Sequence, residues 1–324
     1  QVLYYPLGFF RNFLAAPVFN FSLPLLMIPI ILLKRIKLIL DLDFISKPYL
    51  GSLRHIFFLI QILILKLLQS TVKAVIVTRN ILVLELLKNL KFDEALIKYI
   101  PHGVPETRIT VTSFSDISEV RKRFELSGPV ILYWGFISRY KGIDYLIRAV
   151  KEVIKEFPTV KLIITGDYFD PRARLKPQQH RYLPSLKNLV ESLKLNNSVI
   201  FITKFLTDNE IDSLIALADI VVLPYSTKTL SASGVLARVM AHGKPVIVTD
   251  CGWFHGYVFN GINGLIVTQR NELALAEAIT LILRDEQLRM RLKKNMREIA
   301  RRLSWENTAK MWLNVLNGAC HDTI

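Results

Sequence analysis

The residues of this chain best placed for chemistry are hydroxyls in a loop between an apolar strand and a helix. The apolar run 220–223 is followed by a loop of small and hydroxyl side chains that ends at Gly234. A helix starting near Val235 would direct free backbone N–H groups and the positive end of its dipole at this loop. The pattern predicts a phosphate site. A plain helix cap formed by Ser231 or Ser233 is an about equally common alternative.

A second junction between a strand and a helix carries basic side chains. A strand expected from Val130 ends at Gly135, and Arg139 and Lys141 then precede a helix expected over 143–157. Open parallel sheets bind their ligands outside the carboxyl ends of the strands. Cations at this junction would therefore face the same ligand as the hydroxyl loop.

These two junctions together resemble the nucleotide-sugar glycosyltransferases of family four, which have the GT-B fold. The segment Gly135–Gly142 is similar to the family pattern Gly-Arg-x-x-x-x-Lys-Gly, and 240–247 matches Met-Ala-x-Gly-x-Pro-Val-Ile. The resemblance covers about residues 130–310 and extends weakly back to Leu38. It implies transfer of a sugar from a nucleoside diphosphate donor with retention of configuration, no resident cofactor and no metal.

The resemblance also implies roles for individual residues. Lys141 and Arg139 would neutralise the diphosphate leaving group, and backbone N–H groups near Ser233 and Gly234 would bind it. Asp43 would orient an acceptor hydroxyl, although a helix cap or a loop salt bridge is about twice as common for such a residue. The other residues expected on the donor side are Gly135, Gly166, Lys204, Phe205, Thr229 and Ser231. Phe205 fits a core position equally well.

The chain departs from the family at its acidic positions. The paired glutamates of the family fall at Leu230 and Arg238, and the arginine that follows its first glycine falls at Phe136. The segment Gly252–Gly256 lacks the acid of the family's Gly-Gly-x-Pro-Glu turn, and the first domain looks short by several elements. A competing hypothesis from another class is therefore a catalytically degenerate relative that acts as a binding or membrane-docking module.

Strand and helix patterns alternate on both sides of a polar linker at 105–126. This alternation predicts an α/β protein with two Rossmann-like domains, each built on a parallel sheet, which face a cleft in the GT-B fold. The expected acceptor-side domain is 1–126, joined by a C-terminal helix at 306–324, and the expected nucleotide-sugar-binding domain is 127–305. A length of 324 residues suits two domains.

The formal net charge of +15 indicates either an anionic partner or a solvated basic surface, and the two interpretations are about equally common. No nucleic-acid-binding motif is visible, so we expect no nucleic-acid partner. The basic segment Lys34–Lys37 next to apolar helices favours docking on an anionic membrane surface, where a lipid-linked or glycan acceptor would be met. The expected location is cytoplasmic, with peripheral binding to the cytoplasmic face of the membrane.

Two apolar stretches raise the question of a membrane span. The uncharged stretch between Arg11 and Lys34 is interrupted by prolines, and 53–68 carries charged and polar side chains. For the second stretch, a packed or interfacial helix is favoured over a span by roughly three to one. No cleavage-site pattern follows an early apolar run, so we expect no signal peptide. Cys251 and Cys320 show no disulfide or metal spacing.

Overall fold

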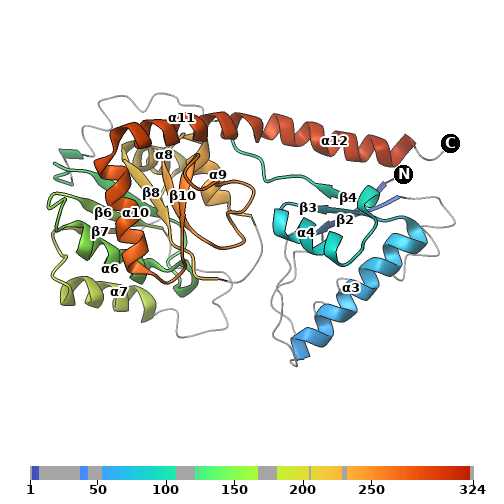
Figure 1. Cartoon of the computed structure of the whole chain (residues 1–324), viewed down its shortest axis with the longest axis horizontal. Helices are drawn as coiled ribbons and strands as arrows, with labels where there is room; N and C mark the ends of the chain where they lie inside the picture. The colour runs from blue at the N-terminus through green and yellow to red at the C-terminus, as the bar shows by residue number, and fades with distance from the viewer. Residues whose placement is uncertain are drawn as a thin grey trace. The chain divides into compact units, whose positions relative to one another are not determined.

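The computed structural model describes residues 2–6, 37–42, 53–106, 121–122, 124–166, 181–203, 206–227 and 232–321. The chain forms two compact units, each with its own parallel sheet (Figure 1). Unit 1 comprises residues 1–103, 228–233 and 305–324, and unit 2 comprises 104–227 and 234–304.

The sheet of unit 1 has the strand order β1-β2-β3-β4, and neighbouring strands pair parallel. Its strands are β1 (Val2–Pro6), β2 (Lys37–Leu42), β3 (Val75–Thr78) and β4 (Ile97–Tyr99). Its helices are α3 (Leu53–Val72), α4 (Ile81–Asn89), the short η1 (Glu94–Leu96) and α12 (Trp305–His321). Every residue of β3 is buried, as expected for a parallel strand covered on both faces.

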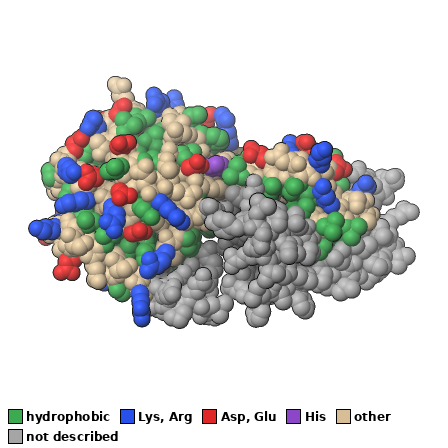
Figure 2. All heavy atoms as spheres, turned by 60° about the horizontal axis from the view of Figure 1, so that its bottom comes forward, with side chains coloured by type: hydrophobic (Ala, Val, Ile, Leu, Met, Phe, Trp, Pro, Cys, Tyr) green, Lys and Arg blue, Asp and Glu red, His purple; other side chains and the backbone are tan. Residues whose placement is uncertain are grey.

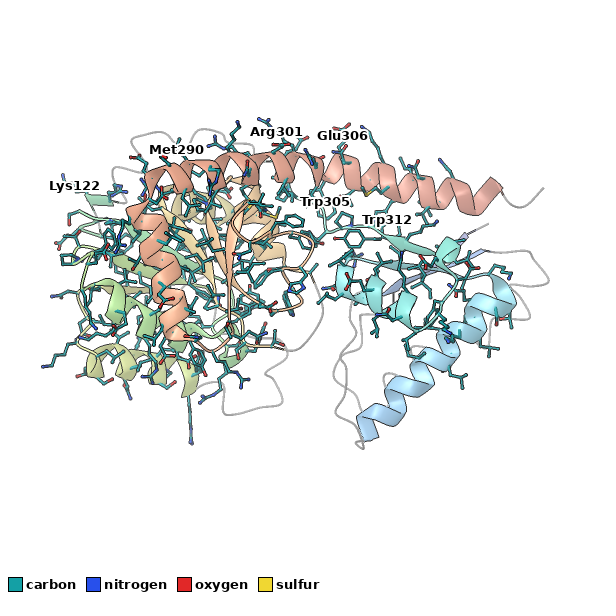
Figure 3. The ribbon with its side chains drawn as sticks, in the orientation of Figure 1. Lys122, Met290, Arg301, Trp305, Glu306 and Trp312 are labelled. Atoms are coloured by element: carbon teal, nitrogen blue, oxygen red, sulfur yellow. The ribbon has the colours of Figure 1, made fainter. Side chains whose placement is uncertain are left out.

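Helix α12 closes unit 1 because it returns to the sheet near the C-terminus. Trp312 packs with Val315 and Leu316 against the buried residues Val75, Val77 and Ile100. Trp305 and Trp312 both point from α12 towards this sheet (Figure 3). A Cβ on Gly103 would lie 2.3 Å from the Trp305 ring, so only glycine fits beneath that indole.

The sheet of unit 2 has the strand order β10-β9-β8-β5-β6-β7, again with parallel pairing. Its strands are β5 (Val130–Trp134), β6 (Lys161–Thr165), β7 (Val199–Ile202), β8 (Ile220–Leu223), β9 (Val246–Thr249) and β10 (Gly264–Val267). Its helices are η2 (Arg139–Lys141), α6 (Ile143–Val153), α7 (Tyr182–Ser192), α8 (Asp208–Leu217), α9 (Gly234–Ala241), α10 (Glu272–Arg284) and α11 (Glu286–Arg302).

The order of the strands reverses between β5 and β8, which are neighbours in the sheet although β6 and β7 separate them in sequence. Helix α6 follows β5 and packs on α10, whereas α9 follows β8 and packs on α11. An open parallel sheet leaves a crevice at the carboxyl ends of two such strands, because the chain leaves them toward opposite faces. The fold therefore places the expected ligand site at the ends of β5 and β8.

These two parallel sheets with their helices confirm the predicted α/β class. The division between the units falls between Gly103 and Val104, earlier in the chain than the expected boundary at 126. The Val104 N–H donates to the carbonyl of Leu303 at 2.7 Å, which ties the start of the expected linker to the end of α11 in unit 2. No helix within the described ranges is long and apolar enough to cross a bilayer.

Candidate functional site

Two glycines shape the carboxyl edge of the unit 2 sheet. Gly135 follows β5 with a φ of 140°, and Gly166 follows β6 with a φ of 141°, values that side-chain-bearing residues rarely adopt. A Cβ on Gly166 would lie only 2.1 Å from the carbonyl oxygen of Gly135. A Cβ on Gly135 would lie 3.6 Å from a methyl group of Val235 in the first turn of α9. The two predicted glycines therefore meet at the edge where α9 begins.

The loop after β5 is also fixed to the segment after β8. Gly142 has a φ of 66°, and a Cβ there would lie 2.0 Å from the carbonyl oxygen of Pro224. The Ser226 N–H donates a 2.7 Å hydrogen bond to the carbonyl oxygen of Tyr140. The two junctions singled out in the sequence thus lie side by side, at the point where the strand order reverses.

Lys141 is buried in this loop, with 4% of its surface exposed. Its Nζ lies 3.5 Å from the ring centroid of Tyr225 and 5.0 Å from those of Tyr140 and Trp253. We call these three rings the aromatic cage. The Tyr225 and Trp253 rings meet edge to face with centroids 5.7 Å apart. Aromatic faces attract a cation, so the cage holds the ammonium group in place.

Arg139 lies in the same 3-10 turn but has different neighbours. Its side chain is exposed, and its Cζ lies 5.3 Å from the ring centroid of Tyr182 at the start of α7. The Tyr182 hydroxyl donates a 2.8 Å hydrogen bond to Asp144. Burial, followed by the negative charge of Asp144, raises the pKa of Tyr182 well above its usual value, so it stays a neutral donor. The role predicted for Arg139 at the diphosphate stays a prediction.

The other predicted site residues are described only in part. Gly234 begins α9 at an exposed position with open space where a Cβ would lie. Ser233 is buried, with 6% of its surface exposed, and belongs to unit 1. Five predicted site residues lie outside the described residues, and their roles stay predictions: Asp43, Lys204, Phe205, Thr229 and Ser231.

Arg238, which stands at a family glutamate position, belongs to a polar network that the sequence did not reveal. Its Nε donates to Asp212 at 2.8 Å, its Nη1 donates to Asp208 at 2.6 Å, and its Cζ lies 5.6 Å from the Trp134 ring centroid. His242 Nε2 lies 2.8 Å from the same oxygen of Asp212. Burial raises the pKa of Asp212, but the hydrogen bonds from Arg238 and His242 outweigh it and lower that pKa.

The spacing of this network offered a signal in the sequence. Asp208 and Asp212 lie one turn apart on α8, and His242, which directly follows α9, lies four residues after Arg238. The network ties α9 to α8 and pairs Arg238 with two carboxylates. This position therefore does not supply the acid that the family has there. The aromatic cage was missed as well, and its signal was Trp253 in the turn where the family has small residues.

Cys251, next to the cage, is buried, and burial raises the pKa of its thiol to about 12. The thiol is therefore protonated and a poor nucleophile. In the part of the chain that the structure describes, no group of three or more His, Cys, Asp or Glu residues is placed to hold a metal ion. The described chemistry of the carboxyl edge thus rests on a caged ammonium group, glycine-shaped backbone and the start of α9.

Comparison with solved structures relates the fold to known proteins. Anabaena Alr3699/HepE, solved in complex with UDP, superposes with a TM-score of 0.76 at 22% identity, covering 98% of this chain and 79% of that one. WaaG, a glycosyltransferase involved in lipopolysaccharide biosynthesis, superposes with a TM-score of 0.63 at 16% identity, covering 94% and 85%. These neighbours and the two parallel sheets confirm the predicted GT-B fold class.

Comparison with curated proteins gives matches over a little more than half of this chain. The alpha-D-kanosaminyltransferase of Streptomyces kanamyceticus is 28% identical over 179 residues, which is 55% of this chain and 42% of that protein. The D-inositol 3-phosphate glycosyltransferase of Corynebacterium urealyticum is 29% identical over 187 residues, 57% of this chain and 42% of that protein. The chain spans about half the length of the curated relatives that it matches.

A family model described as "Glycosyl transferases group 1" matches residues 116–299, more than half of the chain. The match contains both junctions, the aromatic cage and the Arg238 network. The predicted family resemblance is therefore confirmed, and this chain belongs to the group 1 glycosyl transferases.

Proposed function

We propose that the protein transfers a sugar from a nucleoside diphosphate donor to a lipid-linked or glycan acceptor, as an enzyme of carbohydrate biosynthesis. The observation that carries this proposal is Lys141, whose Nζ is held 3.5 Å from the Tyr225 ring centroid at the carboxyl edge of unit 2. A fixed cation beside a helix start stabilises the negative charge that develops on a departing diphosphate. Family membership and the UDP complex of the HepE structure support this choice of donor.

The missing acids shape the proposed mechanism. Arg238 stands at one family glutamate position and is tied to Asp208 and Asp212, so it is not placed to act as a base or a nucleophile. The transfer would then depend on binding and on electrostatic stabilisation of the leaving group, with retention of configuration as the family resemblance implies. The comparisons lend no support to the alternative of a degenerate binding module.

A binding experiment tests the proposed donor site. Calorimetry would compare UDP binding to the parent, to Lys141→Ala and to Lys151→Ala, a control on α6 that removes the same charge from the same unit. Loss of a charge-assisted contact costs about 1.5–3 kcal/mol, so we expect Lys141→Ala to bind roughly ten- to a hundredfold more weakly than the control. Equal affinities of the two folded variants would remove Lys141 from the donor site.

We also propose that unit 1 docks on an anionic membrane surface through α3, where a lipid-linked acceptor would be met. Leu63 is 69% exposed and Leu67 is 45% exposed, although both are large apolar side chains. With Lys66 and Lys73 they line an open hollow of about 500 Å³. Figure 2 shows hydrophobic side chains next to basic ones on the part of unit 1 that this view describes. Exposed leucines flanked by lysines are typical of helices that bind the lipid interface.

The docking surface proposed on α3 differs from the one expected from the sequence. Docking was predicted on the basic segment Lys34–Lys37, of which residues 34–36 lie outside the described residues and Lys37 begins β2. A flotation assay with vesicles containing anionic lipid would compare the parent with Leu63→Ser/Leu67→Ser. The control is Leu273→Ser/Leu281→Ser on α10 of unit 2, where the leucines are 59% and 45% exposed. We expect the α3 variant to lose about tenfold or more in vesicle binding. Equal flotation of both variants would contradict docking through α3.

A further inference from the structure

A group of basic side chains lies at the edge of the unit 2 sheet opposite to Lys141. Asp219 immediately precedes β8, and its carboxylate accepts a 2.8 Å hydrogen bond from the N–H of Val130, the first residue of β5. Both residues therefore mark the amino ends of their strands. The basic side chains around Asp219 form what we call the basic cluster: Arg121, Lys244, Arg289, Lys293 and Arg297.

Several members of the basic cluster are held in place by the fold. The Nζ of Lys244 donates to the carbonyl oxygens of Ala216 and Ala218, at 2.5 and 2.9 Å, where α8 ends. The stem of Arg297 crosses Gly243, and its Cγ lies 2.4 Å from the place where a Cβ would be. Position 243 favours glycine because its φ is 60°, which other residues rarely adopt. The missing Cβ also leaves the space that the Arg297 side chain occupies. The cluster is thus built by α11 and the turn before β9.

A third segment completes the cluster. Nη1 of Arg121 donates to the carbonyl oxygen of Leu126 at 3.2 Å, just before β5 begins. Arg289 lies 3.6 Å from Glu286, whose side chain is 78% exposed, so this ion pair does little to neutralise the cluster. Among the described residues that act on Lys244 and Lys293, the cations therefore outnumber the carboxylates, which are Asp219 and Glu286.

Burial and the neighbouring positive charges lower the pKa of two lysines in the basic cluster. Burial, followed by the positive charges of Lys293, Arg297 and Arg121, lowers the pKa of Lys244 to about 8. Burial and the charges of Arg289 and Arg297 lower the pKa of Lys293. Like charges held this close repel one another, and a bound anion would remove that repulsion.

We propose that the basic cluster binds a phosphate-bearing anion, at a site separate from the proposed donor site. Arginine forks and lysine ammonium groups together are the set that proteins use for phosphate. The strands that separate the two edges are four or five residues long, roughly 13–16 Å at about 3.3 Å per residue, so one small anion does not reach both. Arg297 is exposed, and α11 runs along the surface of unit 2 (Figures 1 and 3).

Calorimetry with inorganic pyrophosphate tests the site on the full chain. The test variant is Lys293→Gln/Arg297→Gln, and the matched control is Arg291→Gln/Lys294→Gln, which removes the same charge from α11 outside the cluster. We expect the test variant to bind pyrophosphate at least about tenfold more weakly than the control. UDP binding measured on the same samples reports the donor site separately, so failure of one proposal is distinguishable from failure of the other.

The source of the phosphate is resolved by a second arm with phosphatidylcholine vesicles that contain phosphatidylglycerol. Weaker pyrophosphate binding with unchanged vesicle binding assigns the site to a free phosphate compound. Vesicle binding that falls in the test variant but not in the control assigns it to a lipid headgroup. Thermal melts confirm folding, and Lys293→Gln alone serves if the double variant unfolds. If pyrophosphate and vesicles bind the test variant and the control equally, the proposal is overturned.

Discussion

The two edges of the unit 2 sheet each hold a lysine, and they hold it by different means. At the carboxyl edge, Lys141 is 4% exposed and its ammonium group is surrounded by aromatic rings. At the amino edge, the half-buried Lys244 donates to two backbone carbonyls and shares its surroundings with other cations. Rings hold the Lys141 ammonium group, whereas carbonyls accept the donors of Lys244 and complete a helix end. Lys244 therefore stabilises the end of α8 within the basic cluster, and Lys141 has no such role at a helix end.

The largest expected effect comes from the glycines that allow these two arrangements. In Gly142→Ala the new Cβ would meet the backbone oxygen of Pro224 at 2.0 Å. Residue 142 also has a positive φ of 66°, which strains an alanine. Backbone cannot yield easily, so we expect a loss of about 3 kcal/mol in the free energy of unfolding. In Gly243→Ala the new Cβ meets the flexible Arg297 side chain, and we expect a loss of only about 1–2 kcal/mol.

Urea unfolding followed by circular dichroism measures both losses. Gly318→Ala is the control, because Gly318 lies within α12 with nothing near the position of its Cβ. Alanine is the better helix former there, so we expect a gain of roughly 0.5–1 kcal/mol. If Gly142→Ala costs no more than Gly243→Ala, the two edges are not constrained in the way the comparison requires.

A smaller effect follows from the pKa of Lys244. Burial and the charges of Lys293, Arg297 and Arg121 lower this pKa from 10.5 to about 8, and Asp219 offsets them only in part. Between pH 8 and 10.5 the unfolded chain binds more protons at this lysine than the folded chain does, so its contribution to stability rises with pH. Below pH 8 the penalty is fully present. The parent should therefore gain on the order of 1–2 kcal/mol over Lys244→Met between pH 7.5 and 9.5.

The measurement is the free energy of unfolding of parent and variant across that pH range. Arg291→Met is the control, because an arginine keeps its charge throughout the range and should show no such trend. A difference between parent and Lys244→Met that stays constant with pH would contradict the lowered pKa. The lysine would then belong to the fold alone, and the basic cluster would lose one of its supports.

The sequence was sufficient for the layout of the fold because its signals were local. Continuous apolar runs such as 162–164 and 221–223 marked buried parallel strands, and Gly135, Gly142 and Gly243 marked the turns between them. The family motifs located Lys141 correctly at the junction between β5 and α6. The sheet order, which makes β5 and β8 neighbours, and the boundary between the units at Gly103 required the structure.

The parts that could not be predicted depend on contacts between distant segments. Tyr225 and Trp253 lie far from Lys141 in sequence, and only the pairing of β5 with β8 brings a ring to within 3.5 Å of the ammonium group. Arg238 looked like a lost acid in the sequence, whereas the structure shows it bound to Asp208 and Asp212. Side-chain partners of this kind follow from tertiary packing, which a linear motif does not encode.

The central claim is that the carboxyl edge of unit 2 supports glycosyl transfer, and turnover tests it most directly. Release of nucleoside diphosphate would be measured across a panel of sugar nucleotides, with and without lipid and glycan acceptors. We expect at least one donor to turn over, slowly with water alone, and Lys141→Ala to reduce the rate roughly a hundredfold while Lys151→Ala leaves it unchanged. If no donor is turned over, or if Lys141→Ala matches Lys151→Ala in rate, the account is contradicted.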